Sequence, residues 1–130
     1  MQKIICNNLQ DLNNFIQDNL KLFKEKKIIL LNGDLGAGKT TFVRLLAKHL
    51  GIKDNITSPS FSYMKNYSGL IHIDLYNYQG DIEEFEDYFE DNVVAIEWAN
   101  LKKYQFDSFV EIDASINREL QHVFEITEVR

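Results

Sequence analysis

The chain has 130 residues, which is enough for one buried core and too few for two. Its 20 acidic and 14 basic side chains leave a formal net charge of −6. This charge argues against a large nucleic-acid footprint, on DNA or RNA, because such a surface is basic on at least one face. The single cysteine, Cys6, excludes a disulfide framework and a thiolate metal site. No apolar run is long enough for a signal peptide or a membrane span, so we expect a cytoplasmic protein without membrane contact.

The apolar pattern of the first fifty residues predicts a strand, a helix, a second strand and a second helix. The first strand covers residues 2–6, and Asn7 or Asn8 is expected to cap the helix that follows. That helix is marked by a stripe of large apolar side chains, namely Leu12, Phe15, Ile16, Leu20 and Phe23. A buried strand over 27–32 precedes a helix over 41–50, and Gly51 ends this helix.

The segment between that strand and that helix, GDLGAGKT at residues 33–40, matches the phosphate-binding pattern G-x-x-x-x-G-K-[ST]. Glycines let backbone N–H groups converge on a phosphate without a Cβ in the way. Lys39 would add a positive charge at the β- and γ-phosphates, and the Thr40 hydroxyl would be a magnesium ligand. The chain is therefore predicted to bind a nucleoside triphosphate, through Asp34, Leu35, Gly36, Ala37, Gly38, Lys39, Thr40 and Thr41.

The rest of the chain predicts further strands. Residues 53–68 are polar and expected to be irregular, 70–75 form a strand, and the acidic stretch that follows carries a helical stripe of apolar side chains. Further strands are predicted over 93–96, 109–112 and 121–126. Strands alternating with helices indicate a parallel core, and late strands without a helix between them indicate an antiparallel extension. The predicted fold is α/β, a single P-loop NTPase-like domain over 1–130 whose mainly parallel sheet is flanked by helices.

Two carboxylates are candidates for organising magnesium. Asp74 and Glu97 each stand at the carboxyl end of a predicted strand, the edge at which open α/β sheets bind ligands. Either residue can instead mark the point where a strand emerges into water. His72 shares a strand face with Asp74 and is interpreted as a core histidine in preference to a residue that positions the site. Trp98 either packs over the site or belongs to the core or to a partner contact.

The segment TSPSF at residues 57–61 occupies the place of a switch loop in small triphosphatases. Thr57 is the candidate for sensing the γ-phosphate or its magnesium, and Pro59 restricts the loop. The alternative is that Thr57 or Ser58 is a plain turn residue. The acidic run over 81–91 is either a solvated helix face or a docking surface for a basic partner.

Four segments in this order resemble the TsaE (YjeE) family, bacterial proteins required for threonylcarbamoyladenosine modification of tRNA. They are GDLGAGKTT at 33–41, TSPSF at 57–61, HIDLY at 72–76 and IEW at 96–98. The phosphate loop alone is shared by many ATPases, whereas the four segments with these spacings are specific. The resemblance covers essentially the whole chain. One departure is Asn77, which stands where the family often has arginine.

The resemblance implies roles for individual residues. Lys39 would bind the phosphates of ATP, and Thr40 with Glu97 would ligate Mg²⁺. Asp74 would act near the metal, and Thr57 would belong to the switch-like loop. The adenine or ribose side would be touched by an asparagine near the N-terminus, Asn7 or Asn8, and by Arg118.

The resemblance also implies a function and partners. The expected activity is magnesium-dependent ATP hydrolysis that supports threonylcarbamoyladenosine modification of tRNA in complex with TsaD and TsaB, with tRNA reached only through that complex. Lys39, Asp74 and Thr57 are the expected catalytic residues. Turnover of the protein alone is expected to be slow because neither Arg44 nor Arg118 is assured as an internal arginine finger. The alternatives are a small-molecule kinase and a nucleotide-dependent binding module without significant turnover.

Overall fold

The computed structural model describes residues 2–59, 62–102 and 106–129. These residues form a sheet with the strand order β1-β7-β6-β2-β5-β4-β3. The strands are β1 (Gln2–Cys6), β2 (Ile28–Asn32), β3 (Met64–Tyr67), β4 (Leu70–Asp74), β5 (Val93–Glu97), β6 (Phe109–Ile116) and β7 (His122–Val129). The helices are α1 (Leu9–Asp18), α2 (Leu20–Lys26), α3 (Lys39–His49) and two 3₁₀ helices, η2 (Ile82–Tyr88) and η3 (Ala99–Leu101).

The centre of the sheet is parallel and both of its edges are antiparallel. β2 pairs in parallel with β5 and with β6, and β4 pairs in parallel with β5. β6, β7 and β1 follow as an antiparallel extension, and β3 is antiparallel to β4 at the other edge. The α/β fold with a parallel core and an antiparallel extension is therefore confirmed.

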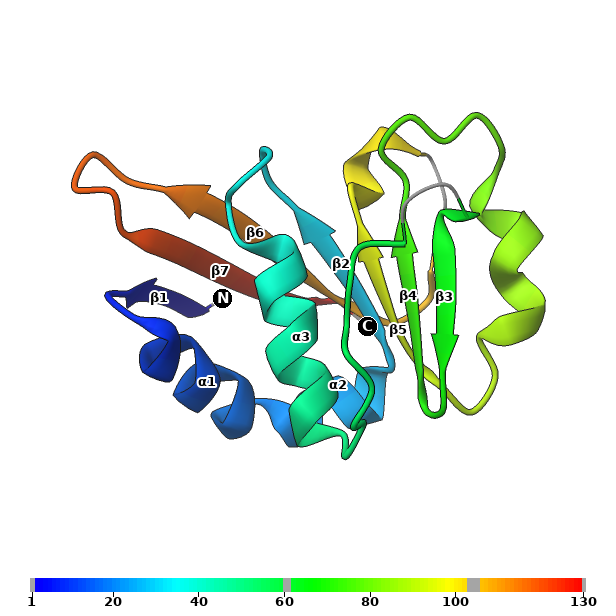
Figure 1. Cartoon of the computed structure of the whole chain (residues 1–130), viewed down its shortest axis with the longest axis horizontal. Coiled ribbons are helices and arrows are strands. Elements are labelled where there is room, and N and C mark those ends of the chain that lie inside the picture. The colour runs from blue at the N-terminus through cyan, green and yellow to red at the C-terminus, as the bar shows by residue number, and fades with distance from the viewer. Residues whose placement is uncertain (1, 60–61, 103–105, 130) are drawn as a thin grey trace.

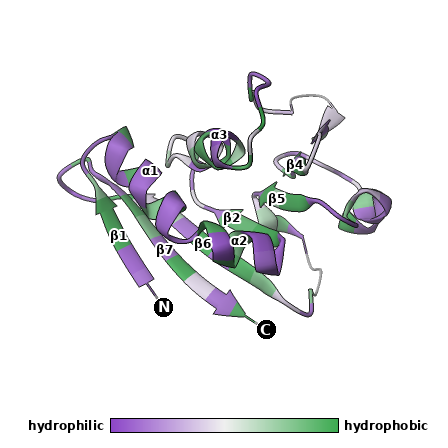
Figure 2. Ribbon diagram, turned by 90° about the horizontal axis from the view of Figure 1, so that it is seen from below, coloured by the Kyte–Doolittle hydropathy of each residue, from purple (hydrophilic) through white to green (hydrophobic). Residues whose placement is uncertain are grey.

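Two apolar clusters lie on opposite faces of the sheet. One cluster joins α1, α2 and α3 to β2, β6 and β7, with Phe23, Phe42 and Phe124 at its centre. The other joins β4 and β5 to η2, through side chains such as Ile73 and Phe85. Figure 1 shows α3 lying across the middle of the sheet, with α1 and α2 beside it and η2 at the far edge. In Figure 2 the hydrophobic colour gathers on β5 and other central strands, whereas α1 is largely hydrophilic on its outer side.

The predicted helix carrying the 12–23 stripe is in fact two helices, α1 and α2, separated at Asn19. The Asn19 side chain donates to the Phe15 carbonyl oxygen at 2.9 Å, which closes the last turn of α1. The stripe continues across this break because both helices pack on the same face of the sheet. Asn8 rather than Asn7 caps α1, since its Oδ1 accepts from the Asp11 amide at 2.9 Å.

Three other predictions need correction. The expected irregular stretch over 53–68 contains the edge strand β3, which turns back at Gly69 (φ +98) to pair with β4. Only Tyr67 of this strand is buried, so its sequence lacks the apolar alternation by which strands are predicted. The acidic helical segment is a 3₁₀ helix, and α3 begins at Lys39, two residues before the predicted start. None of the described helices combines the length and the apolar character that a bilayer crossing requires.

Candidate functional site

The 33–40 loop connects the end of β2 to the start of α3, as the pattern predicts. Gly38 is the N-cap residue of α3 with φ +111, and its lack of a side chain leaves the first amides of the helix without a side-chain cap. A Cβ on Gly38 would lie 3.2 Å from Phe124 Cζ and 3.4 Å from His122 Nδ1. A Cβ on Gly33 would lie 2.4 Å from the Ala114 carbonyl oxygen. The loop can therefore pass this close to β6 and β7 only with glycine at these two positions.

Lys39 is almost fully buried, with 5% of its surface exposed. Its Nζ donates to the carbonyl oxygens of Gly33 and Asp34, the latter at 3.0 Å, and lies 4.2 Å from the centre of the Trp98 ring. Burial lowers the pKa of Lys39, and the carboxylates of Glu97, Asp74 and Asp34 oppose that shift. The ammonium group is thus held by the loop itself, in a position where an entering phosphate would compete for it.

Glu97 is the last residue of β5 and is 3% exposed. The Thr40 hydroxyl lies 3.0 Å from each of its carboxylate oxygens, and His72 Nε2 lies 2.5 Å from Oε2. Thr40 comes from the first turn of α3, and His72 comes from β4. A buried carboxylate is therefore held between a helix and a neighbouring strand.

Asp74 stands directly opposite Glu97 in the β4–β5 pairing. Burial raises the pKa of the Asp74 carboxyl and the nearby Glu97 raises it further, while hydrogen bonds from the Tyr76 amide and the Ser58 hydroxyl lower it. The Tyr76 amide donates at 3.0 Å and the Ser58 hydroxyl at 3.3 Å. Two carboxylates thus face one region from adjacent strand ends, as the sequence predicts.

A cavity of about 280 Å³ lies over these groups. This loop cavity is lined by residues that include Gly36, Lys39, Thr40, Ser58, Asp74, Glu97 and Trp98. Its hydroxyl and carboxylate oxygens are the hard donors that Mg²⁺ prefers. Among the described residues no group of three or more His, Cys, Asp or Glu side chains is arranged around a metal position. Mg²⁺ sites of the phosphate-loop type fit this pattern because they use one or two protein oxygens together with phosphate oxygens and water.

A second cavity, of about 430 Å³, lies beside the first. This hairpin cavity is lined by the β1–α1 connection, the turn between β6 and β7, and the start of α3, with Cys6, Asn8, Leu9, Glu119, Leu120 and Gln121 among its residues. A side-chain hydrogen bond from Gln121 to Asn7 joins the two connecting segments. Gly38, Thr41 and His122 line both cavities, so the two cavities adjoin one another.

Of the two hydroxyl residues in the predicted switch loop, the structure brings Ser58 and not Thr57 to the loop cavity. Thr57 is exposed, does not line the loop cavity, and accepts a hydrogen bond from Lys65 Nζ at 3.1 Å. Ser58 lines the cavity and contacts Asp74 instead. The pattern of residues 57–61 gives no basis for choosing between the two hydroxyls. Ser60 and Phe61, the end of that segment, lie outside the described residues.

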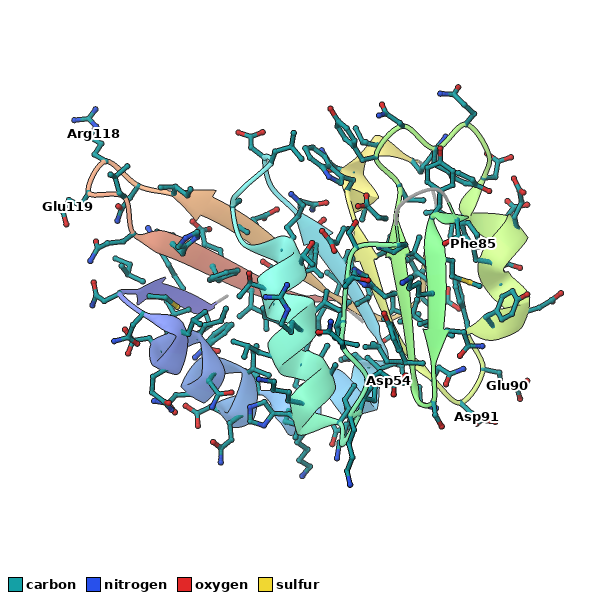
Figure 3. The ribbon with its side chains drawn as sticks, viewed as in Figure 1. Asp54, Phe85, Glu90, Asp91, Arg118 and Glu119 are labelled. Carbon is teal, nitrogen blue, oxygen red and sulfur yellow. The ribbon has the colours of Figure 1, made fainter. Side chains whose placement is uncertain are left out.

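Arg118 is not brought to either cavity. It lies at the tip of the β6–β7 turn and extends away from the rest of the molecule (Figure 3). Its neighbours Glu119 and Leu120 line the hairpin cavity in its place. Asn77 is also outside both cavities, in a turn at φ +63 that asparagine tolerates better than most residues.

One residue of the site, His122, was not predicted for it. His122 donates from Nδ1 to the Ala37 carbonyl oxygen at 2.9 Å, and so ties β7 to the 33–40 loop. Because His122 lies 85 positions along the chain from Ala37, no local pattern indicates the contact. Trp98, for which packing over the site was one of three predicted roles, lies over Lys39 and against Tyr76, whose ring centre is 5.0 Å away, and it also packs against the apolar cluster of β4, β5 and η2.

A family model and individual relatives of known name both match this chain and agree on one family. The sequence model described as "Threonylcarbamoyl adenosine biosynthesis protein TsaE" matches residues 6–123. A relative from Aquifex aeolicus, named tRNA threonylcarbamoyladenosine biosynthesis protein TsaE, is 33% identical over 119 residues, which is 87% of each chain. A relative of the same name from Rickettsia felis is 36% identical over 110 residues, which is 78% of this chain and 64% of the relative. The match thus spans slightly less than two thirds of the Rickettsia felis protein.

The fold is also found in a solved structure. The crystal structure of YdiB from Bacillus subtilis superposes with a TM-score of 0.73 at 25% sequence identity, covering 99% of this chain and 86% of the other. The likeness therefore extends over the 33–40 loop, the sheet and the β6–β7 turn.

Proposed function

The chain belongs to the TsaE family of threonylcarbamoyl adenosine biosynthesis proteins, and on this basis we propose that it is a magnesium-dependent ATPase that serves threonylcarbamoyladenosine modification of tRNA. The observation that carries the proposal is the arrangement at the loop cavity of two buried charged side chains, Lys39 and Glu97, with the half-buried Thr40 hydroxyl against the Glu97 carboxylate. A buried lysine and a hydroxyl–carboxylate pair beside a glycine-rich helix start suit a triphosphate and its metal ion.

The phosphates of ATP would lie in the loop cavity. The backbone amides at the start of α3 would bind their oxygens, and Lys39 would leave the carbonyl oxygens of Gly33 and Asp34 to contact the β- and γ-phosphates. Thr40 and Glu97 would hold Mg²⁺, which when bound neutralises charge that develops on the transferred phosphoryl group. The loop cavity is thereby assigned the reacting end of the nucleotide.

Asp74 is suited to orienting the attacking water. Its carboxylate lines the loop cavity beside Glu97, and its raised pKa makes it a better proton acceptor than an ordinary surface aspartate. Ser58 donates to the same carboxylate and would respond to changes there. Asp74 and Lys39 remain in the proposed catalytic set, whereas for the switch-like role we propose Ser58 in place of Thr57.

The nucleoside would lie in the hairpin cavity. This cavity adjoins the phosphate site through Gly38, Thr41 and His122, and its walls combine apolar side chains such as Leu120 with polar ones such as Asn8. Such a mixture suits a planar base and a ribose. Arg118 is not part of this proposal because it points away from the cavity.

We propose that turnover requires partners. Of the described residues, no arginine lines the loop cavity, and an arginine supplied at that position commonly raises phosphoryl-transfer rates by roughly 10³–10⁵. By family resemblance the partners would be TsaD and TsaB, and tRNA would be reached through their complex. The net charge of −6 is compatible with such indirect contact.

The test is phosphate release from ATP and Mg²⁺, for the protein alone and with TsaD and TsaB of the same organism. We expect slow release alone, a rise of at least about tenfold that requires both partners, and loss of activity in Lys39→Ala. Transfer of phosphate to a small-molecule acceptor would replace the proposal with a kinase. Partner binding that depends on ATP without any phosphate release would replace it with a nucleotide-dependent binding module.

A further inference from the structure

His72 is completely buried in the middle of β4, and its Nε2 lies 2.5 Å from Glu97 Oε2. Within the described residues, its other ring nitrogen, Nδ1, is buried without a hydrogen-bond partner. A buried ring nitrogen without a hydrogen bond destabilises the folded state. A histidine that only filled the core would therefore be less favourable there than an apolar side chain of similar size, unless its second nitrogen makes a specific contact. The single polar contact of His72 is made to the carboxylate proposed to bind magnesium.

The register of two parallel strands brings these side chains together. His72 stands opposite Ala95, and Asp74 stands opposite Glu97, so His72 and Glu97 are diagonal neighbours across β4 and β5. The small side chain of Ala95 leaves room for the imidazole ring to extend along the sheet toward Glu97. A shift of one residue would move His72 to the opposite face of β4, so the contact depends on this register.

Thr40 alone does not fix the orientation of the Glu97 carboxylate. Its hydroxyl lies 3.0 Å from both Oε1 and Oε2, and one hydroxyl proton can satisfy only one of them. A carboxylate only accepts, so the proton in the short contact belongs to His72 Nε2. With Oε2 held by His72, the Thr40 hydroxyl is the partner of Oε1 among the described residues, and Glu97 and Thr40 both line the loop cavity.

We propose that His72 is a positioning residue for Glu97, holding its carboxylate so that Glu97 and Thr40 together present a preformed pair of oxygen ligands to magnesium. This inference rests on the proposed function, because it assigns His72 a role only if the nucleotide is bound with the metal. Outer contacts of this kind typically change metal affinity by about 10- to 100-fold when they are removed. Among the described residues, the hydrogen bonds of Lys39 go to Gly33 and Asp34 and that of His72 goes to Glu97, so we expect metal-free nucleotide binding to be independent of His72.

The experiment measures Mg²⁺ affinity of the full-length protein saturated with a non-hydrolysable ATP analogue, and separately the affinity for that analogue in EDTA. In His72→Leu we expect Mg²⁺ affinity to fall about 10- to 100-fold, while analogue affinity in EDTA stays within about twofold. His72→Gln places an amide donor near the position of Nε2 and is expected to recover most of the Mg²⁺ affinity.

Ile71→Ala is the matched control because Ile71 is fully buried on the same strand and packs in the cluster on the other face. It is expected to lower thermal stability at least as much as His72→Leu and to leave Mg²⁺ affinity unchanged. Equal loss of Mg²⁺ affinity in Ile71→Ala would overturn the inference, because the effect would then follow stability.

The experiment distinguishes failure of the proposed function from failure of the role proposed for His72. If the unmodified protein binds the analogue equally with and without Mg²⁺, the proposed function itself is wrong. If Mg²⁺ strengthens binding in the unmodified protein and His72→Leu retains that gain, only the role of His72 is wrong. Equal Mg²⁺ affinity in His72→Gln and His72→Leu would also overturn the role of His72, because a hydrogen-bond donor at this position would then not determine Mg²⁺ affinity.

Discussion

The loop cavity and the hairpin cavity adjoin one another but are built in opposite ways. The loop cavity gathers charged side chains that already have hydrogen-bond partners, such as Lys39 with the loop carbonyls and Glu97 with the Thr40 hydroxyl. The hairpin cavity is larger and is lined mainly by apolar and neutral polar side chains, together with Glu119, and most of them come from the two ends of the chain. The charges of the first are therefore paired in advance, whereas the shape of the second depends on how distant segments meet.

This difference assigns separate tasks to the two cavities. Preorganised charges suit phosphate binding and chemistry, whereas a less polar cavity suits recognition of a base. Changes in the loop cavity should then affect triphosphates of any kind, and changes in the hairpin cavity should affect only ligands that carry a nucleoside. Comparing the affinity for inorganic tripolyphosphate, which has no nucleoside, with the affinity for ATP distinguishes the two kinds of change.

Replacement of Lys39 by Ala is expected to have the largest effect. It removes the buried ammonium group of the loop cavity, so affinity for ATP and for tripolyphosphate should both fall by at least about 100-fold, because a charge-assisted contact to phosphate is lost. Calorimetric titration of both ligands measures this. Lys48→Ala is the control, since Lys48 is exposed in the last turn of the same helix. Retained tripolyphosphate binding in Lys39→Ala would contradict the assignment of the loop cavity to phosphate.

Asp74→Asn should separate chemistry from binding within the loop cavity. Loss of a residue that orients water or accepts a proton lowers turnover by about 10²–10⁴-fold. ATP affinity should change little, because Asp74 is not proposed to contact the phosphates directly. Phosphate release in the presence of the partners measures turnover, and equilibrium titration measures affinity. A parallel loss of both would place Asp74 among the binding groups instead.

Leu120→Asn tests the hairpin cavity. Leu120 is 81% exposed at φ +64, a conformation that asparagine adopts more readily than leucine, so the turn should keep its shape. Removal of this apolar wall should weaken ATP by about three- to tenfold and leave tripolyphosphate binding unchanged. Leu101→Asn, an exposed leucine outside both cavities, is the control. Equal weakening of the two ligands would remove the distinction between the cavities.

The smallest expected effect concerns the free energy of unfolding of Asp74→Asn, measured without metal or nucleotide, and it follows from the raised pKa of Asp74. Its folded-state pKa lies above the ordinary value of 3.8, chiefly because of burial. Above its folded-state pKa the carboxylate is ionised in both states and penalises the folded one, so Asp74→Asn should raise the free energy of unfolding there by roughly 0.5–2 kcal/mol. The gain should shrink as the pH falls through the folded-state pKa and vanish below 3.8, where both states are protonated.

Denaturant unfolding at pH 7 and at pH 3.5 provides the comparison. Asp54→Asn serves as the charge-matched control, since Asp54 is exposed and lies away from the loop cavity (Figure 3). A stability gain in Asp74→Asn that is equal at both pH values would show that the carboxylate charge is not its cause.

Much of the loop cavity was predictable because its parts are local or lie at strand ends. The glycine-rich loop requires only a preceding strand and a following helix. Asp74 and Glu97 were predicted together because the carboxyl ends of parallel strands meet at one edge of a sheet. The choice between Thr57 and Ser58, by contrast, depends on the path of an irregular segment, and no periodicity specifies that path.

The sequence by itself determined the α/β fold, the glycine-rich loop between β2 and α3 and the pair of carboxylates, since each follows from periodicity or from a contiguous pattern. Only the tertiary structure decided that His72 reaches Glu97 and that His122 contacts the loop. It also decided that the β6–β7 turn completes the second cavity while Arg118 points away. These features depend on strand register and on contacts between segments far apart in the chain. Those contacts form only when the whole sheet packs, so no local sequence pattern specifies them.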